Sequence, residues 1–90
     1  MINLLRELSM VSPSGSEGIF LAEIEDKIRD KVDELRYDNM GNLIARKGEG
    51  GKKIMLCAHA DTIGLMALYI EESGFIRFAP LGDVMSQSIL

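Results

Sequence analysis

Apolar residues recur at helical spacing over the first third of the chain. Residues 2–8 show this pattern, and Pro13 and Gly15 end it, so the sequence predicts a short first helix. Ser14 and Glu17 are then spaced as in a capping box, in which a serine hydroxyl and a glutamate carboxylate each cap a backbone amide. A longer helix is expected from here, with one apolar face formed by Phe20, Ile24, Ile28 and Val32.

After Leu35 the pattern changes to short β-like runs separated by turn residues. Residues 38–42 suit a turn between two strands, with a positive φ at Gly41, and residues 71–74 suit the turn of a hairpin. Five strands are expected, at residues 35–37, 43–46, 54–59, 65–70 and 75–78. Two helices followed by these strands predict an α/β fold.

The third expected strand is apolar at every position from residue 54 to residue 58. This pattern is typical of a strand covered on both faces, and it predicts that Cys57 is a small buried residue. Only one long amphipathic helix is available as cover, and the last segment, residues 84–90, is also largely apolar. The chain is therefore expected to need more protein, either attached to it or as a partner.

Length and charge exclude several classes of function. Ninety residues suffice for one domain that buries roughly 60% of its unfolded surface. The balance of 14 acidic against 10 basic residues argues against a nucleic-acid partner. A single cysteine excludes an internal disulfide, and no apolar run approaches the ~18 residues of a membrane span. With no signal-peptide pattern at residues 1–7, the expected location is the cytoplasm.

The candidate chemistry lies where the apolar strand stops. His59, the one histidine, is followed two positions later by Asp61. On extended backbone both side chains project to the same side, so the carboxylate can orient the imidazole while the other ring nitrogen binds a metal. The spacing also suits a histidine that only caps a strand end. One histidine does not complete a catalytic metal site by itself.

Four segments in the same order resemble the glutamyl or deblocking aminopeptidases: residues 14–17, 37–45, 54–66 and 74–78. The family consists of dinuclear-metal exopeptidases, some labelled endoglucanases, that assemble from dimers into tetrahedral shells. The resemblance implies that residues 1–72 are the N-terminal segment of a mixed-sheet, zinc-peptidase-like (phosphorylase/hydrolase-like) catalytic domain. It implies that residues 73–90 begin an inserted β-rich dimerisation domain.

The resemblance also implies roles for individual residues. His59 matches the first metal ligand of the family and Asp61 the aspartate that orients it, whereas Thr62 stands where the family often has glutamate. The implied cofactors are two zinc or cobalt ions, and the implied substrates are peptides with free N-termini. The other ligands and the general base of the family lie downstream of this sequence. The 90-residue chain alone is therefore expected to be inactive.

Two alternatives remain open at this stage. The first is a non-catalytic interaction module whose apolar strands and residues 84–90 pair with another subunit. The second takes the endoglucanase label literally and needs two carboxylates that flank a glycosidic bond. Glu71 and Glu72 are adjacent, so on a regular strand they would face opposite ways, and the plainer interpretation is a pair of surface turn carboxylates.

Overall fold

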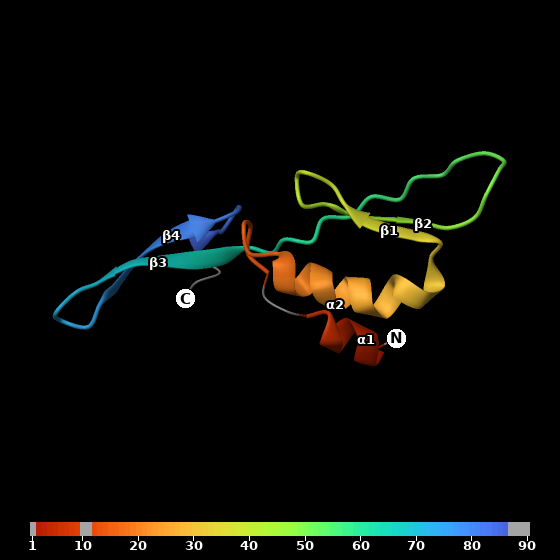
Figure 1. Ribbon diagram of the computed structural model, residues 1–90. Helices are drawn as coiled ribbons and strands as arrows, with labels where there is room; N and C mark the ends of the chain where they lie inside the picture. The colour runs from red at the N-terminus through yellow and green to blue at the C-terminus, as the bar shows by residue number, and fades with distance from the viewer. Residues whose placement is uncertain (1, 10–11, 87–90) are drawn as a thin grey trace.

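The computed structural model describes residues 2–9 and 12–86. It has two parts, which one extended loop segment connects (Figure 1). The first part contains two helices, a 3-10 turn and a two-stranded sheet, and the second part is one hairpin. The elements are α1 (Ile2–Glu7), α2 (Gly18–Ile28), η1 (Arg29–Lys31), β1 (Glu34–Tyr37), β2 (Leu43–Arg46), β3 (Gly64–Ile70) and β4 (Ile76–Leu81). The α/β fold class is confirmed.

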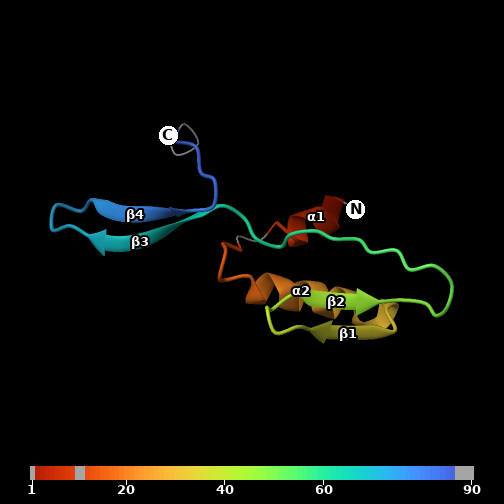
Figure 2. The ribbon, with the colours of Figure 1, turned by 90° about the horizontal axis from the view of Figure 1, so that it is seen from above.

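Helix α2 supports the sheet β1–β2 on one side and contacts α1 on the other (Figures 1 and 2). The expected apolar face is confirmed for the three residues that lie on the helix and are half-buried: Phe20, Ile24 and Ile28. The ammonium of Lys27 donates a hydrogen bond to Glu7 at 2.5 Å, which ties α2 to α1. The prediction is wrong for Val32, because the α-helix ends at Ile28 and Val32 lies beyond it, half-buried but in extended conformation.

The start of α2 differs from the capping-box prediction. The helix begins at Gly18, and Ser14 is not its N-cap. Residues 13–16 form a turn instead, closed by a hydrogen bond from the Ser16 amide to the Pro13 carbonyl. Because Gly15 has a φ of 89°, Glu17 reaches back to its amide at 2.9 Å and stabilises that turn.

The turn between β1 and β2 is organised by one carboxylate. Asp38 accepts hydrogen bonds from the backbone amides of Met40 and Asn42, at 2.9 Å each, and from the Asn42 side chain at 2.8 Å. Gly41 has a φ of 85°, so the positive φ expected at this position is confirmed. The antiparallel pairing runs from Glu34 opposite Arg46 to Tyr37 opposite Leu43.

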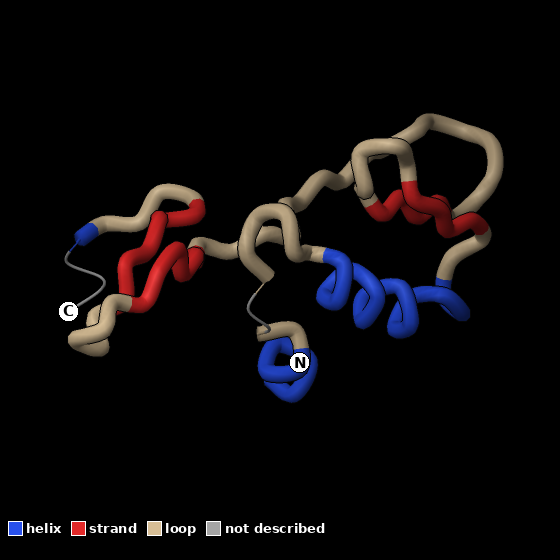
Figure 3. Tube along the Cα trace, turned by 60° about the vertical axis from the view of Figure 1, so that its left-hand side comes forward, coloured by secondary structure: helices blue, strands red, loops and turns tan. Residues whose placement is uncertain are grey.

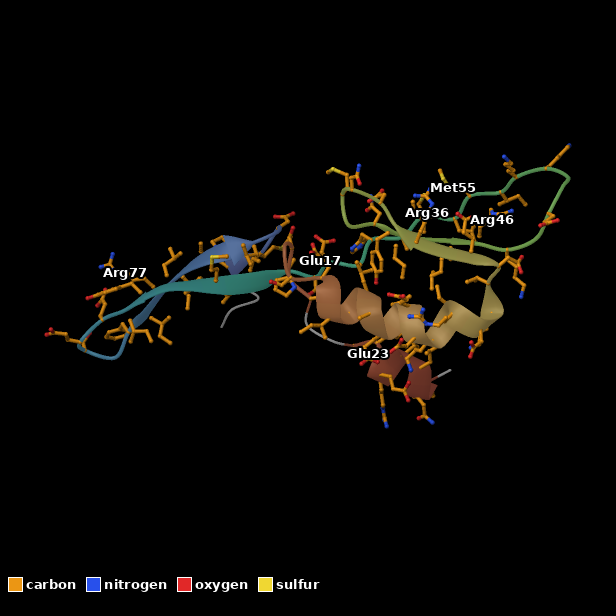
Figure 4. All side chains as sticks on the ribbon, viewed as in Figure 1. Glu17, Glu23, Arg36, Arg46, Met55 and Arg77 are labelled. Carbon is orange, nitrogen blue, oxygen red and sulfur yellow. The ribbon has the colours of Figure 1, made fainter. Side chains whose placement is uncertain are left out.

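The second expected hairpin is also confirmed. Strands β3 and β4 pair antiparallel, with an irregularity in register between Ala67 and Tyr69. The guanidinium of Arg77 donates to Glu71 at 2.6 Å beside the turn, and Arg77 lies on the outer part of the hairpin in Figure 4. The expected domain boundary between residues 72 and 73 falls within this turn.

The prediction of a buried strand at residues 54–59 is wrong for this structure. These residues form no strand, and the side chains of Ile54, Met55 and Leu56 are 87%, 84% and 92% exposed. The segment returns along the β1–β2 sheet without pairing (Figure 3), and Met55 stands on it above the sheet in Figure 4. Cys57 is exposed, not buried. A strand needs backbone hydrogen bonds to a neighbouring strand, and among the described residues no backbone hydrogen bond joins this segment to the sheet that it runs along.

The burial expected for one domain of this length is not reached. No hydrophobic side chain among residues 2–9 and 12–86 is buried, and the accessible surface is 8188 Å². A compact monomer of 9.9 kDa exposes about 5,200 Å². The radius of gyration is 17.6 Å, against about 12 Å for a compact domain of this length. The apolar faces of the elements are formed, but they are largely uncovered.

Two further expectations concern the membrane and the last residues. Within the described part of the chain, no helix is long and apolar enough to cross a membrane. In the apolar segment at residues 84–90, Val84 is half-buried and Met85 is 66% exposed. Residues 87–90 lie outside the described residues, so the predicted pairing role of this segment stays a prediction.

Candidate functional site

His59 and Asp61 lie on the connecting chain between the two parts of the molecule, just before β3. The Nδ1 atom of His59 is 3.1 Å from the carboxylate Oδ1 of Asp61 and 3.0 Å from the Asp61 backbone carbonyl. The two side chains therefore meet on the same side of the backbone, although the segment is not part of a strand. Their side chains are 87% and 45% exposed.

The surroundings of His59 indicate the tautomer of its neutral ring. Both groups beside Nδ1 are hydrogen-bond acceptors, so Nδ1 must carry the proton to bond with either of them. The other nitrogen, Nε2, then presents a lone pair, and the ring that carries it is exposed. This arrangement suits an imidazole that ligates a cation through Nε2.

The loop that contains the pair is attached to the turn before α2. Ser12 Oγ donates to the carbonyl of Ala60 at 2.5 Å, and the Ser12 amide donates to Thr62 Oγ1 at 3.1 Å. In return, the Thr62 amide donates to the Ser12 carbonyl at 2.8 Å, and Pro13 and Thr62 form a parallel bridge. We call this set of contacts between residues 12–13 and 60–62 the clasp.

The sequence patterns did not indicate Ser12 as a functional residue. It is the one buried residue in the described part of the chain, with 1% of its surface exposed. No periodicity marks a serine before a turn, and its partners are some fifty positions later in the sequence. The one sequence feature that pointed toward this contact is Thr62, the partner of Ser12, which the family resemblance places close to the candidate ligand His59.

The described residues contain one candidate ligand and not a complete metal site. Across residues 2–9 and 12–86, no three His, Cys, Asp or Glu side chains gather closely enough to hold an ion. His59 with Asp61 fits one ligand and the carboxylate that orients it. Among the turn carboxylates, Glu71 is engaged with Arg77 and Glu72 is exposed, as expected for surface residues.

The chain is similar to several proteins named as aminopeptidases. A putative aminopeptidase of Acetivibrio thermocellus is 45% identical over 85 residues, which cover 93% of this chain and 26% of the relative. The putative aminopeptidase FrvX of Escherichia coli is 37% identical over 90 residues, covering 99% of this chain and 25% of the relative. The lysyl aminopeptidase of Pyrococcus furiosus is 35% identical over 78 residues, covering 86% of this chain and 22% of the relative.

These similarities extend over most of the 90 residues, and the chain spans about a quarter of the length of these relatives. A sequence family described as M42 glutamyl aminopeptidase matches residues 41–90, which include the hairpin β1–β2 in part, the His59–Asp61 pair and all of β3–β4. The resemblance drawn from the four sequence segments is thereby confirmed. The chain belongs to the M42 glutamyl aminopeptidase family of peptidases.

Proposed function

We propose that this chain is the N-terminal part of a dinuclear metal-dependent aminopeptidase that removes N-terminal residues from peptides. The observation that carries the proposal is the 3.1 Å contact between His59 Nδ1 and Asp61, which leaves Nε2 available as a ligand. Family membership supports the reaction class. With one ligand among the described residues, the isolated chain is proposed to be inactive.

In this proposal each residue of the pair has one task. His59 would hold one cation through Nε2, and Asp61 would keep the imidazole in the Nδ1–H tautomer. When bound, zinc or cobalt would lower the pKa of a water molecule and polarise the scissile carbonyl. Asp61 acts on the ring and not on substrate, so it is a positioning residue.

We also propose that two parts of the chain belong to different domains. Residues 1–72 are assigned to a mixed-sheet catalytic domain and residues 73–90 to a β-rich dimerisation domain. Because β3 pairs with β4 across this boundary, the hairpin itself would join the two proposed domains. Its uncovered apolar strands are consistent with assembly into dimers and larger shells. A cytoplasmic location remains a prediction from the sequence.

A graft tests the role of His59. The chain replaces the matching segment of the Pyrococcus furiosus lysyl aminopeptidase, and hydrolysis of lysyl p-nitroanilide is measured with zinc or cobalt. We expect the graft to be active, and His59→Ala to lower bound metal and to reduce kcat/KM by at least about 100-fold, because a ligand is lost. Asp61→Asn is expected to cost roughly 10- to 100-fold in metal affinity or activity.

Glu72→Gln is the matched control, because it removes an exposed carboxylate of the hairpin turn and is expected to leave kcat/KM unchanged. A His59→Ala graft with full metal content and full activity would refute the ligand role. Turnover by the purified 90-residue chain would refute its proposed inactivity. A stable, metal-independent oligomer of the chain, together with an inactive graft, would instead favour the non-catalytic interaction module.

A further inference from the structure

The clasp joins two segments that are far apart in the sequence and that lie on either side of the candidate ligand loop. Its hydrogen bonds end at Ala60 and at Thr62, the residues immediately before and after Asp61. The backbone on both sides of Asp61 is therefore fixed to residues 12–13. This is the one place in the described chain where a polar side chain, Ser12, is buried.

The close approach of the two segments extends beyond the hydrogen bonds. A Cβ atom placed on Gly64 would lie 3.1 Å from the Cβ of Pro13, so the chain leaving the loop passes directly against the proline ring. Thr62 contributes both its amide and its hydroxyl to the clasp. A side chain without an acceptor atom at this position would leave the Ser12 amide without its partner.

We propose that Ser12 and Thr62 are positioning residues for His59, acting through the backbone of residues 60–62. The anchored backbone holds the carbonyl and carboxylate of Asp61 at 3.0 and 3.1 Å from Nδ1, so that the proton stays on Nδ1 and the lone pair stays on Nε2. The inference rests on the proposed ligand role of His59. It assigns a task to Thr62, the position at which the family often has glutamate.

The test uses the metal-free 90-residue chain and two NMR readouts. Hydrogen exchange of the Thr62 amide reports whether the clasp is closed, and the ¹⁵N shifts of the His59 ring report which nitrogen carries the proton. In the parent chain we expect a protected Thr62 amide and a predominant Nδ1–H tautomer. Ser12→Ala and Thr62→Val are each expected to speed Thr62 exchange by roughly threefold to tenfold and to shift the ring toward Nε2–H.

Two variants serve as controls. Thr62→Ser keeps a hydroxyl acceptor and is expected to restore both the parent exchange rate and the parent tautomer. Ser14→Ala removes an exposed serine from the neighbouring turn and is expected to change neither readout. Should Ser12→Ala unfold the chain, shown by loss of amide protection in β3–β4, the comparison of Thr62→Val with Thr62→Ser decides the question.

Two results would overturn the inference. One is a Thr62 amide that exchanges in the parent chain as fast as in an unstructured peptide, because the clasp would then be absent. The other is faster Thr62 exchange in the variants with an unchanged His59 tautomer, because the clasp would then be merely structural. Neither readout involves metal or substrate, so this inference can fail while the graft is active, and it can hold while the graft is inactive.

Discussion

Single polar side chains determine the local geometry of this molecule where burial does not. Glu17 fixes the turn before α2, Asp38 organises the β1–β2 turn, and Ser12 fixes the loop of His59. Glu17 and Asp38 accept from backbone amides of their own short segments, whereas Ser12 donates to the backbone carbonyl of Ala60, which is distant in the sequence. With almost no apolar burial nearby, these hydrogen bonds decide which turn conformation is populated.

The Asp38 carboxylate gives the β1–β2 turn a response to acid. Hydrogen bonds from the Asn42 side chain and then from backbone amides hold the pKa of Asp38 below its ordinary value of 3.8. Since the pKa is lower in the folded turn, the turn is stabilised above pH 3.8 and loses this stabilisation as the pH falls through the folded pKa. An NMR titration of the carboxyl carbon, read with amide exchange in β1 and β2, measures both effects.

Asp38→Asn provides the comparison for this titration. The asparagine side chain keeps one oxygen acceptor for the turn but does not ionise in this pH range. Amide exchange in β1 and β2 of the variant should therefore lack the acid-dependent change that Asp38 causes in the parent chain. An Asp38 carboxyl that titrates at or above 3.8 in the parent chain would contradict the expectation.

Secondary structure follows the sequence pattern closely at the scale of elements. The apolar stripe of α2 and both hairpins were predictable, because helical period, strand alternation and turn chemistry are local properties. The start of α2 was missed, because a positive φ at Gly15 let Glu17 cap a turn amide and not the helix. The strand predicted at residues 54–59 does not form, because strand formation needs backbone hydrogen bonds to a neighbouring strand, which no local pattern specifies.

In the candidate site, too, local features were predictable from the sequence and contacts between distant segments were not. The contact of His59 with Asp61 was predictable from their spacing, since side chains two residues apart on extended backbone share one side. The clasp was not predictable, because Ser12 and Ala60 come together only through the fold.

The β1–β2 turn depends on the conformational freedom of Gly41. Its φ is 85° and an added Cβ would meet nothing within 4 Å, so the cost of Gly41→Ala is conformational and not steric crowding. We expect the hairpin to lose about 1–2 kcal/mol, measured by amide exchange in β1 and β2. Gly41→Asn should cost less, because asparagine visits this region more readily.

Gly50→Ala is the control for this prediction. Gly50 also has a positive φ, 71°, and an added Cβ would meet nothing within 4 Å, but it lies in the loop after β2, outside the paired residues. The substitution should leave exchange in β1 and β2 close to that of the parent chain. Equal effects of the alanine substitutions at Gly41 and Gly50 would show that the turn conformation does not control the hairpin.

The whole molecule exposes far more surface than a compact chain of its mass, and this has a measurable consequence. We expect the isolated 90 residues to bind a hydrophobic dye such as ANS and to unfold over a broad range of urea, because no hydrophobic side chain in the described residues is buried. We also expect the exposed thiol of Cys57 to react with a disulfide reagent as fast as a peptide cysteine.

In the grafted enzyme, the same thiol should react slowly, because the remainder of the relative would cover the segment that contains it. The expectation for the whole molecule would be contradicted if the isolated chain unfolded over a narrow range of urea, did not bind ANS and had a slowly reacting Cys57 thiol.

The uncovered segment at residues 54–58 also makes aggregation between copies of this chain a risk. Five consecutive residues without charge, proline or glycine form the kind of segment that stacks into cross-β aggregates between copies. Lys52 and Lys53 stand immediately before it, where like charges on neighbouring copies would repel one another in a stack. We therefore expect the two lysines to slow aggregation through this segment.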